Sequence, residues 1–164
     1  GRLTRAPWGV IFPNAQPVPA DHPTVAQWAR EIGIDISGQS WVNMPRHPSQ
    51  LYEALLEGVV LFLVMWFLVR PRTRVKGVLV GTYLIGYALA RFVAEYFRAP
   101  DPGLDFVVQL GPSNNPRWLL LSPWNLTTGQ LLSVGMAAAG VIWLIACHII
   151  DHRRPRVETW SRDT

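Results

Sequence analysis

The chain has 164 residues, of which 49% are hydrophobic and only 16% are charged, and it contains eight tryptophans. So few charges are unusual for a soluble domain of this size, and the composition favours a membrane protein. The formal net charge of +4 would suit a nucleic-acid partner. The basic residues, however, gather at the ends of apolar segments instead of forming an extended basic surface, so we exclude nucleic acid.

The first 46 residues are rich in proline and polar side chains, which predicts an irregular segment outside the membrane. One short helix is expected within it over residues 23–32, with proline in its first turn and Gly33 just after its end. Its apolar residues share one face: Val25, Trp28, Ala29 and Ile32. This face should rest on protein or on the lipid surface.

Three later segments predict membrane-spanning helices: residues 51–69, 77–97 and 131–150. Each is apolar and close to the roughly 20 residues that cross a hydrocarbon core. Residues 47–164 should therefore form a membrane domain, and the fold class is an all-α, polytopic helical bundle. Gly135 and Gly140 lie among the small residues of the third segment and predict close packing against a neighbouring helix. Before the first segment, Pro48 should turn the chain and Ser49 should cap the helix.

Basic residues indicate on which side of the membrane the connecting segments lie. Four crowd the short link between the first two spans and three follow the third span: Arg70, Arg72, Arg74, Lys76, Arg153, Arg154 and Arg156. The longer link between the second and third spans holds only Arg98 and Arg117. By the positive-inside rule the short link and the C-terminus are cytoplasmic, while residues 1–46 and the 98–130 link face outwards.

Arg91 lies inside the second apolar span, with Tyr87 and Glu95 four residues to either side. An arginine at mid-membrane costs about 2.5 to 3.5 kcal/mol even on lenient insertion scales, and it marks a functional site by default. At about 1.5 Å of rise per residue, Arg91 should lie about 10 Å below the outer boundary and Glu57 of the first span about 9 Å below it. The two side chains are therefore predicted to meet.

The polar residues at this depth and just above it are expected to line one outward-facing cavity. They are Arg46, His47, Gln50, Tyr52, Glu53, Glu57, Tyr87, Arg91, Glu95 and Arg98. Arginines and tyrosines at this level are suited to bind an anion, and the anion at the edge of a bilayer is a lipid phosphate. Membrane lipid is therefore a predicted partner.

An alternative stays open, in which these charges neutralise one another and only hold the helices together. Arg91 would then pair with Glu95, at a spacing of four residues on one helix. The glutamates of the first span would pair with Arg98 or Arg91. Tyr52 and Tyr87 would serve as interfacial anchors.

No pattern typical of metal or covalent chemistry stands out. His47 has no second histidine or cysteine near it at the spacing of metal ligands. Cys147, the only cysteine, is expected to be a packing residue. The sequence has neither a nucleophile elbow nor a phosphate-binding glycine loop. We therefore predict no metal and no cofactor, and an enzyme of this kind would take its nucleophile from its substrate.

Four motifs resemble a known family when taken together. They are residues 46–54 (RHPSQLYEA), 86–92 (GYALARF), 95–98 (EYFR) with Pro100 and Asp101, and 129–133 (GQLLS). Their order, spacing and placement on the three spans are similar to the C-terminal half of the phosphatidylglycerol:prolipoprotein diacylglyceryl transferases. The resemblance covers nearly the whole chain.

The resemblance implies a multi-pass enzyme of the bacterial inner (plasma) membrane whose active face is extracytoplasmic. Such an enzyme transfers the diacylglyceryl group of phosphatidylglycerol to the lipobox cysteine of a prolipoprotein signal peptide. A thioether forms and glycerol phosphate is released, so the nucleophile belongs to the substrate. No cofactor is implied.

The resemblance also implies roles for individual residues. Arg91 would hold the phosphate and stabilise the leaving group, and Tyr87 would bind the headgroup or orient Arg91. Gly1 matches the glycine that follows the Gly-Glu-Leu-Trp element of the family signature. The substrate-binding residues would be Gly1, Arg46, His47, Gln50, Tyr52 and Arg98, and the supporting residues would be Glu53, Glu57 and Glu95.

Two departures from the family pattern qualify this interpretation. The core of the family signature and the earlier spans would precede Gly1, so the chain is expected to be a fragment that is inactive alone. Residues 105–126 also form a longer link than is usual between the last two spans of the family. The alternative is a non-catalytic membrane element in which Arg91 forms only an internal ion pair.

Overall fold

Three long helices dominate the computed structural model, which describes residues 1–100, 103, 106–110, 116–120 and 122–153. The first span is helical from Ser49 to Arg72. It comprises α2 (Ser49–Glu53), the π-helical η1 (Ala54–Val60), α3 (Leu61–Leu63), the π-helical η2 (Val64–Val69) and the 3-10 turn η3 (Arg70–Arg72). The other two are α4 (Val78–Glu95) and α5 (Thr128–His152). All three are long and apolar enough to cross a membrane, which confirms the predicted all-α membrane bundle.

The helices begin and end within three residues of the predicted spans. The predicted cap at the start of the first span is wrong. Pro48 holds the N-cap position, Ser49 is already helical, and no side chain caps the helix there. The backbone N–H of Ser49 instead donates to the carbonyl oxygen of His47, at 2.8 Å.

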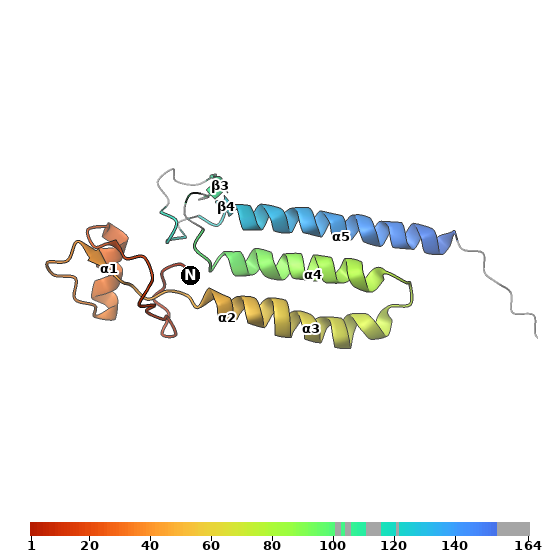
Figure 1. The fold of residues 1–164 in the computed structure, drawn as a ribbon, viewed down its shortest axis with the longest axis horizontal. Coiled ribbons are helices and arrows are strands. Elements are labelled where there is room, and N and C mark those ends of the chain that lie inside the picture. The colour runs from red at the N-terminus through yellow and green to blue at the C-terminus, as the bar shows by residue number, and fades with distance from the viewer. Residues whose placement is uncertain (101–102, 104–105, 111–115, 121, 154–164) are drawn as a thin grey trace, which may run out of the picture.

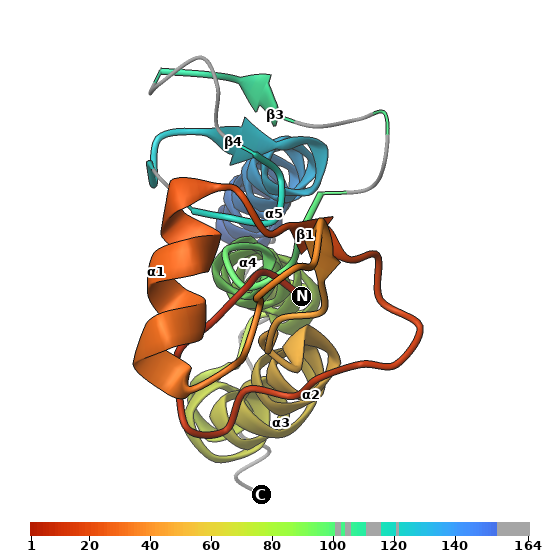
Figure 2. The same ribbon diagram turned by 90° about the vertical axis from the view of Figure 1, so that its left-hand side faces the viewer.

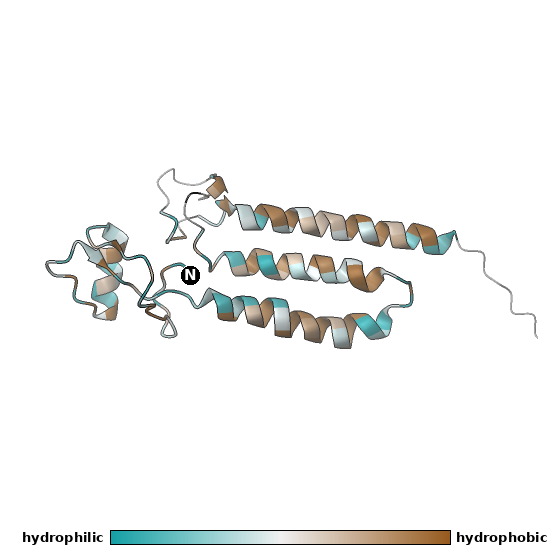
Figure 3. Ribbon diagram, in the orientation of Figure 1, coloured by the Kyte–Doolittle hydropathy of each residue, from teal (hydrophilic) through white to brown (hydrophobic). Residues whose placement is uncertain are grey.

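The three helices lie side by side, and α4 lies between the first span and α5 (Figure 1). The N-terminal segment and the longer link meet at one end of the bundle, while the short basic link and the C-terminal end of α5 meet at the other (Figure 1). Apolar residues follow most of the length of the helices, as Figure 3 shows. This arrangement places the predicted outward-facing segments at a common end. Asp101, Asp105, Arg154 and Arg156 lie outside the described residues.

Glycines allow α4 to pack closely against α5. A Cβ atom at Gly140 would lie 2.8 Å from Cγ1 of Ile85 and 3.0 Å from the carbonyl oxygen of Gly81. The predicted close packing is therefore confirmed at Gly140. A Cβ at Gly135 would meet nothing within 4 Å, so Gly135 is not part of this contact.

The N-terminal segment has a small core of its own. Strand β1 (Val18–Pro19) pairs with β2 (Trp41–Val42) in antiparallel register, and α1 (Pro23–Ile32) packs beside them. The buried apolar residues are Leu3, Val18, Ala20, Val25, Ala29, Val42, Met44 and Leu119. The predicted helix is confirmed, including its end at Gly33 with a φ of 74°. Its apolar face rests on protein, and the segment lies across one end of the bundle (Figure 2).

The longer link, between α4 and α5, is joined by hydrogen bonds to the N-terminal segment and to the strand that precedes α5. Strand β3 (Phe106–Val108) pairs with β4 (Leu126–Thr127), which leads directly into α5. The backbone N–H of Leu3 donates to the carbonyl oxygen of Trp118 at 2.9 Å, and that of Arg2 donates to Phe97 at 3.0 Å. The N-terminal segment thus holds the link against the end of α4.

We expect Gly140→Ala to destabilise the bundle, because the new methyl group would force α4 and α5 apart. Overpacking of this kind costs about 1 to 3 kcal/mol. Gly135→Ala is the matched control: it makes the same change on the same helix where space is open, and the higher helix propensity of alanine favours it by up to about 1 kcal/mol. Unfolding of both variants in detergent, followed by circular dichroism, checks this. Equal stabilities would contradict the assigned helix contact.

Candidate functional site

Arg91 of α4 lies among three carboxylates at the end of the bundle that carries the N-terminal segment. Its Nη1 lies 3.2 Å from Oε1 of Glu53 and 3.4 Å from Oε1 of Glu57, both on the first span. Its Nη2 lies 3.5 Å from Oε2 of Glu95, one turn along α4. The predicted meeting of Arg91 and Glu57 is confirmed. These ion pairs join the first span to α4, and we call the group the Arg91 cluster.

The cluster carries more negative than positive charge. Arg98 adds a second guanidinium, with Nη1 3.7 Å from Oε1 of Glu53, so two arginines face three glutamates. The ion pairs that the alternative interpretation requires are therefore present. The Arg91 side chain nevertheless keeps 24% of its surface exposed, so a ligand can reach the guanidinium. Such pairs hold an arginine in position as well as neutralising it.

Glu95 ties the cluster to the first turn of α5. Its residue surface is only 5% exposed, and the hydroxyl of Thr127 donates to its Oε1 at 3.1 Å. Thr127 also caps α5, in a capping box with Gln130. A Cβ on Gly129 would lie 2.8 Å from the carboxyl carbon of Glu95. The Glu95 carboxylate thus packs directly on Gly129, close to the positive end of the helix dipole, and a side chain at this position would shift it.

Tyr87 lies on the same face of α4 as Arg91. Its hydroxyl group lies near the Glu57 carboxylate, and its ring stacks on Tyr83 with 6.1 Å between centroids. Tyr87 therefore lies beside a carboxylate that pairs with Arg91.

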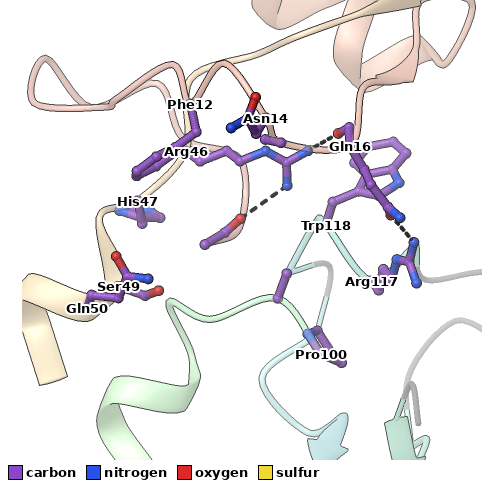
Figure 4. A pocket seen from close by; sticks show the side chains of 13 residues that line it. Phe12, Asn14, Gln16, Arg46, His47, Ser49, Gln50, Pro100, Arg117 and Trp118 are labelled. Atoms are coloured by element: carbon purple, nitrogen blue, oxygen red, sulfur yellow. Dashed lines mark hydrogen bonds between the residues drawn. The ribbon is translucent and has the colours of Figure 1, made fainter. Parts of the chain in front are cut away.

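A separate cavity of about 430 Å³ lies above the membrane-spanning helices, and we call it the Arg46 cavity. The described residues that line it include four of the predicted substrate-binding residues, Gly1, Arg46, His47 and Gln50, together with Arg117 and Trp118 (Figure 4). Gly1 packs so closely on the carbonyl group of His47 that a Cβ would overlap it. The single polar cavity predicted from the sequence is therefore two neighbouring groups. The reason is that Arg46 and His47 precede the helix, whereas Glu53 and Glu57 turn towards α4.

Tyr52 lies outside both the Arg91 cluster and the lining of the Arg46 cavity. The indole N–H of Trp8 donates to its hydroxyl oxygen at 2.7 Å, and the hydroxyl lies 3.1 Å from Nδ1 of His47. The hydroxyl can accept from Trp8 and also donate to Nδ1 or accept from it, according to the tautomer of His47. Burial lowers the pKa of His47. His47 is therefore a neutral imidazole at physiological pH.

Sequence reasoning missed Arg2, which is one of the largest buried side chains. Its surface is 2% exposed, and it donates from Nε to the carbonyl oxygen of Arg98 at 2.9 Å and from Nη1 to that of Leu119 at 3.1 Å. Burial lowers the pKa of Arg2 to about 10. No local pattern marks this residue, because its partners lie about a hundred residues away. Thr127 could have been found from its spacing to Gln130, which is typical of a capping box.

Within the described part of the chain, no group of three or more histidine, cysteine, aspartate or glutamate side chains has the geometry of a metal site. The Arg91 cluster and the Arg46 cavity together offer guanidinium groups, carboxylates, side-chain amides and the imidazole of His47.

Comparison with known proteins adds a family match. The model of the prolipoprotein diacylglyceryl transferase family matches residues 1–146. The phosphatidylglycerol–prolipoprotein diacylglyceryl transferase of Treponema pallidum is 41% identical over 161 residues, which cover 96% of this chain and 48% of the relative. The protein of the same name from Borreliella afzelii is 37% identical, over 95% of this chain and 47% of its own. The protein of that name from Paraburkholderia phymatum is 43% identical, over 88% of this chain and 44% of its own length. The chain spans about half the length of these relatives.

We expect Thr127→Val to destabilise the protein by about 1 to 2 kcal/mol, because it removes the cap of α5 and leaves the buried Glu95 carboxylate without this donor. Thr128→Val is the matched control, since Thr128 is the next residue and does not occupy the cap position. Thermal unfolding in detergent separates the two. Equal losses would show that the Thr127 hydroxyl has no special role.

Proposed function

The chain belongs to the prolipoprotein diacylglyceryl transferase family, and from this premise we propose that it forms part of an enzyme that transfers the diacylglyceryl group of phosphatidylglycerol to a prolipoprotein. The acceptor is the thiol of the lipobox cysteine. A sulfur–carbon bond forms, the carbon–oxygen bond to the phosphate breaks, the thiol proton is lost and glycerol phosphate leaves. The observation that carries the proposal is the Arg91 cluster, which lies at the polar end of a three-helix membrane bundle in a chain of this family.

We place the enzyme in the bacterial plasma membrane with the Arg91 cluster towards the outer face. The basic residues Arg70, Arg72, Arg74 and Lys76 lie in and beside the short link at the opposite end of the bundle (Figure 1). Such clusters stay on the cytoplasmic side. This orientation puts the cluster on the side where secreted prolipoproteins emerge.

Arg91 is proposed to act on the leaving group. As the carbon–oxygen bond breaks, negative charge develops on the phosphate, and a guanidinium already fixed in place stabilises that charge without reorganising. Glu53, Glu57 and Glu95 supply the fixed position. The three carboxylates contact only Nη1 and Nη2 of Arg91, so the phosphate can bind the remaining N–H donors or displace one of the carboxylates.

Tyr87 is proposed to position Arg91 through Glu57. Its hydroxyl lies near that carboxylate, which limits where the Glu57 side chain can point. It also lies on the face of α4 that a headgroup would approach to reach Arg91.

A second candidate function is a non-catalytic membrane element. The observation in its favour is that the carboxylates around Arg91 outnumber the arginines. In that case the cluster would contribute only to the stability of the bundle. The activity of Arg91 variants distinguishes the two candidates.

We expect Arg91→Ala to lower diacylglyceryl transfer by about 100- to 1,000-fold, the usual cost of removing one donor that stabilises transition-state charge. Arg91→Lys should recover only part of the activity, because lysine keeps the charge and loses the planar fork. The assay measures transfer of labelled diacylglycerol from phosphatidylglycerol to a lipobox peptide. It uses this chain alone and joined to the preceding half of the Treponema pallidum relative.

Arg72→Gln at the opposite end of the bundle is the control, and it should leave transfer unchanged. Circular dichroism and protease protection confirm that each variant is folded and inserted. Full transfer by Arg91→Ala would return Arg91 to a structural ion pair. No transfer by the joined parent protein would favour the non-catalytic element.

A further inference from the structure

Two arginines from distant parts of the chain converge on the Arg46 cavity. Arg46 follows β2, and Arg117 lies in the link between α4 and α5. Both bind Gln16: Nη2 of Arg46 donates to its backbone carbonyl oxygen at 2.6 Å, and Nη2 of Arg117 donates to its side-chain oxygen (Figure 4). The N-terminal segment thus brings the two guanidinium groups to one wall of the cavity.

Neither charge is balanced by a carboxylate in the part of the chain that the structure describes. The other hydrogen bond of Arg46 goes from Nη1 to the carbonyl oxygen of Gly1, at 3.2 Å. All three acceptors are neutral, and none of the described residues that line the cavity is acidic. Burial and the positive charge of Arg117 together lower the pKa of Arg46. A buried cation beside another cation is costly unless an anion joins them.

Arg46 also has unused hydrogen-bonding capacity. The residue is 8% exposed, and its Nε has no hydrogen-bond partner among the described residues. Buried donors without a partner are rare, and each calls for an explanation. An anion in the cavity would supply both the missing acceptor and the missing charge.

The cavity has the size and lining of a small-molecule site. Its volume of about 430 Å³ lies within the range of roughly 300 to 1,000 Å³ that is usual for such sites. Neutral polar side chains of Asn14, His47 and Gln50 line it, and Trp118 and Phe12 contribute apolar walls. Guanidinium groups match the oxygens of a phosphate, and neutral amides and an imidazole match hydroxyl groups.

We propose that the Arg46 cavity binds a phosphate group through Arg46 and Arg117, at a site separate from the Arg91 cluster. Resting on the proposed function, its ligand is glycerol phosphate, either as the product after it leaves Arg91 or as the headgroup of phosphatidylglycerol before its phosphate reaches Arg91. The two sites are neighbours, because Gln50 of the cavity precedes Glu53 of the cluster by three residues, about 4.5 Å of helical rise. The glycerol phosphate therefore binds on the outer side of the reacting bond.

Titration of the chain in phosphatidylcholine nanodiscs with inorganic phosphate and with glycerol phosphate tests the site, with binding followed by calorimetry. We expect Arg117→Gln to weaken binding of both anions about tenfold or more, since it removes a charged hydrogen bond. Arg46→Gln should do the same, but Arg46 also fixes Gly1 and Gln16, so Arg117→Gln is the deciding variant. Arg30→Gln, on the exposed last turn of α1, is the matched control. Equal affinities of the parent and Arg117→Gln, or no binding by the parent, would overturn the proposal.

Nanodiscs that contain phosphatidylglycerol distinguish the two sources of the phosphate. If the lipid headgroup enters the cavity, phosphatidylglycerol should weaken the apparent affinity for free glycerol phosphate, and Arg117→Gln should abolish this competition. Binding without competition supports a site for the released product. If the joined protein binds phosphate but transfers no diacylglyceryl group, the proposed function is wrong and the phosphate site remains. If it transfers the group but its phosphate binding does not depend on Arg117, the phosphate site is wrong and the proposed function remains.

Discussion

The ion pairs of Arg91 are the interaction on which the arrangement of the helices depends. A guanidinium in an apolar bundle is stable only when opposite charges surround it, since removing one partner from a buried pair costs several kcal/mol. Here the partners come from two helices, so the requirement to neutralise Arg91 also fixes how the first span faces α4. Glu95 extends the constraint to α5 through Thr127 and the close approach of Gly129. One partly buried charge thereby links all three spans at their polar end.

The end of the bundle contains three arginine environments with different consequences. The Arg91 cluster has excess negative charge, which holds the guanidinium firmly and makes an anion compete for it. Arg2 is buried on carbonyl oxygens and fastens the link and the end of α4 to the N-terminal segment. Arg46 and Arg117 face a cavity with no acidic residue among its described lining. A guanidinium held by carboxylates and guanidinium groups without a carboxylate partner are thus separated in space among the described residues.

The described part of the chain fits the proposed reaction, in which the thiol nucleophile comes from the substrate. The described side chains at the polar end can bind, orient and neutralise, and the thiol is provided by the proposed prolipoprotein substrate. The chain spans about half the length of its relatives, and the three spans of that half carry the Arg91 cluster between two of them. All of those contacts are made by residues of this half.

The sequence by itself determined the features that depend on local periodicity and on depth along a helix. Uninterrupted apolar runs predicted the three spans, proline and glycine signals predicted α1, and the rise per residue predicted that Arg91 and Glu57 would meet. Tertiary structure alone decided the features that join distant segments. It buried Arg2 against carbonyl oxygens about a hundred residues away, divided the expected polar cavity into two groups, and brought Arg117 beside Arg46. Local patterns carry no information about such contacts, because they depend on how the N-terminal segment and the longer link pack over the end of the bundle.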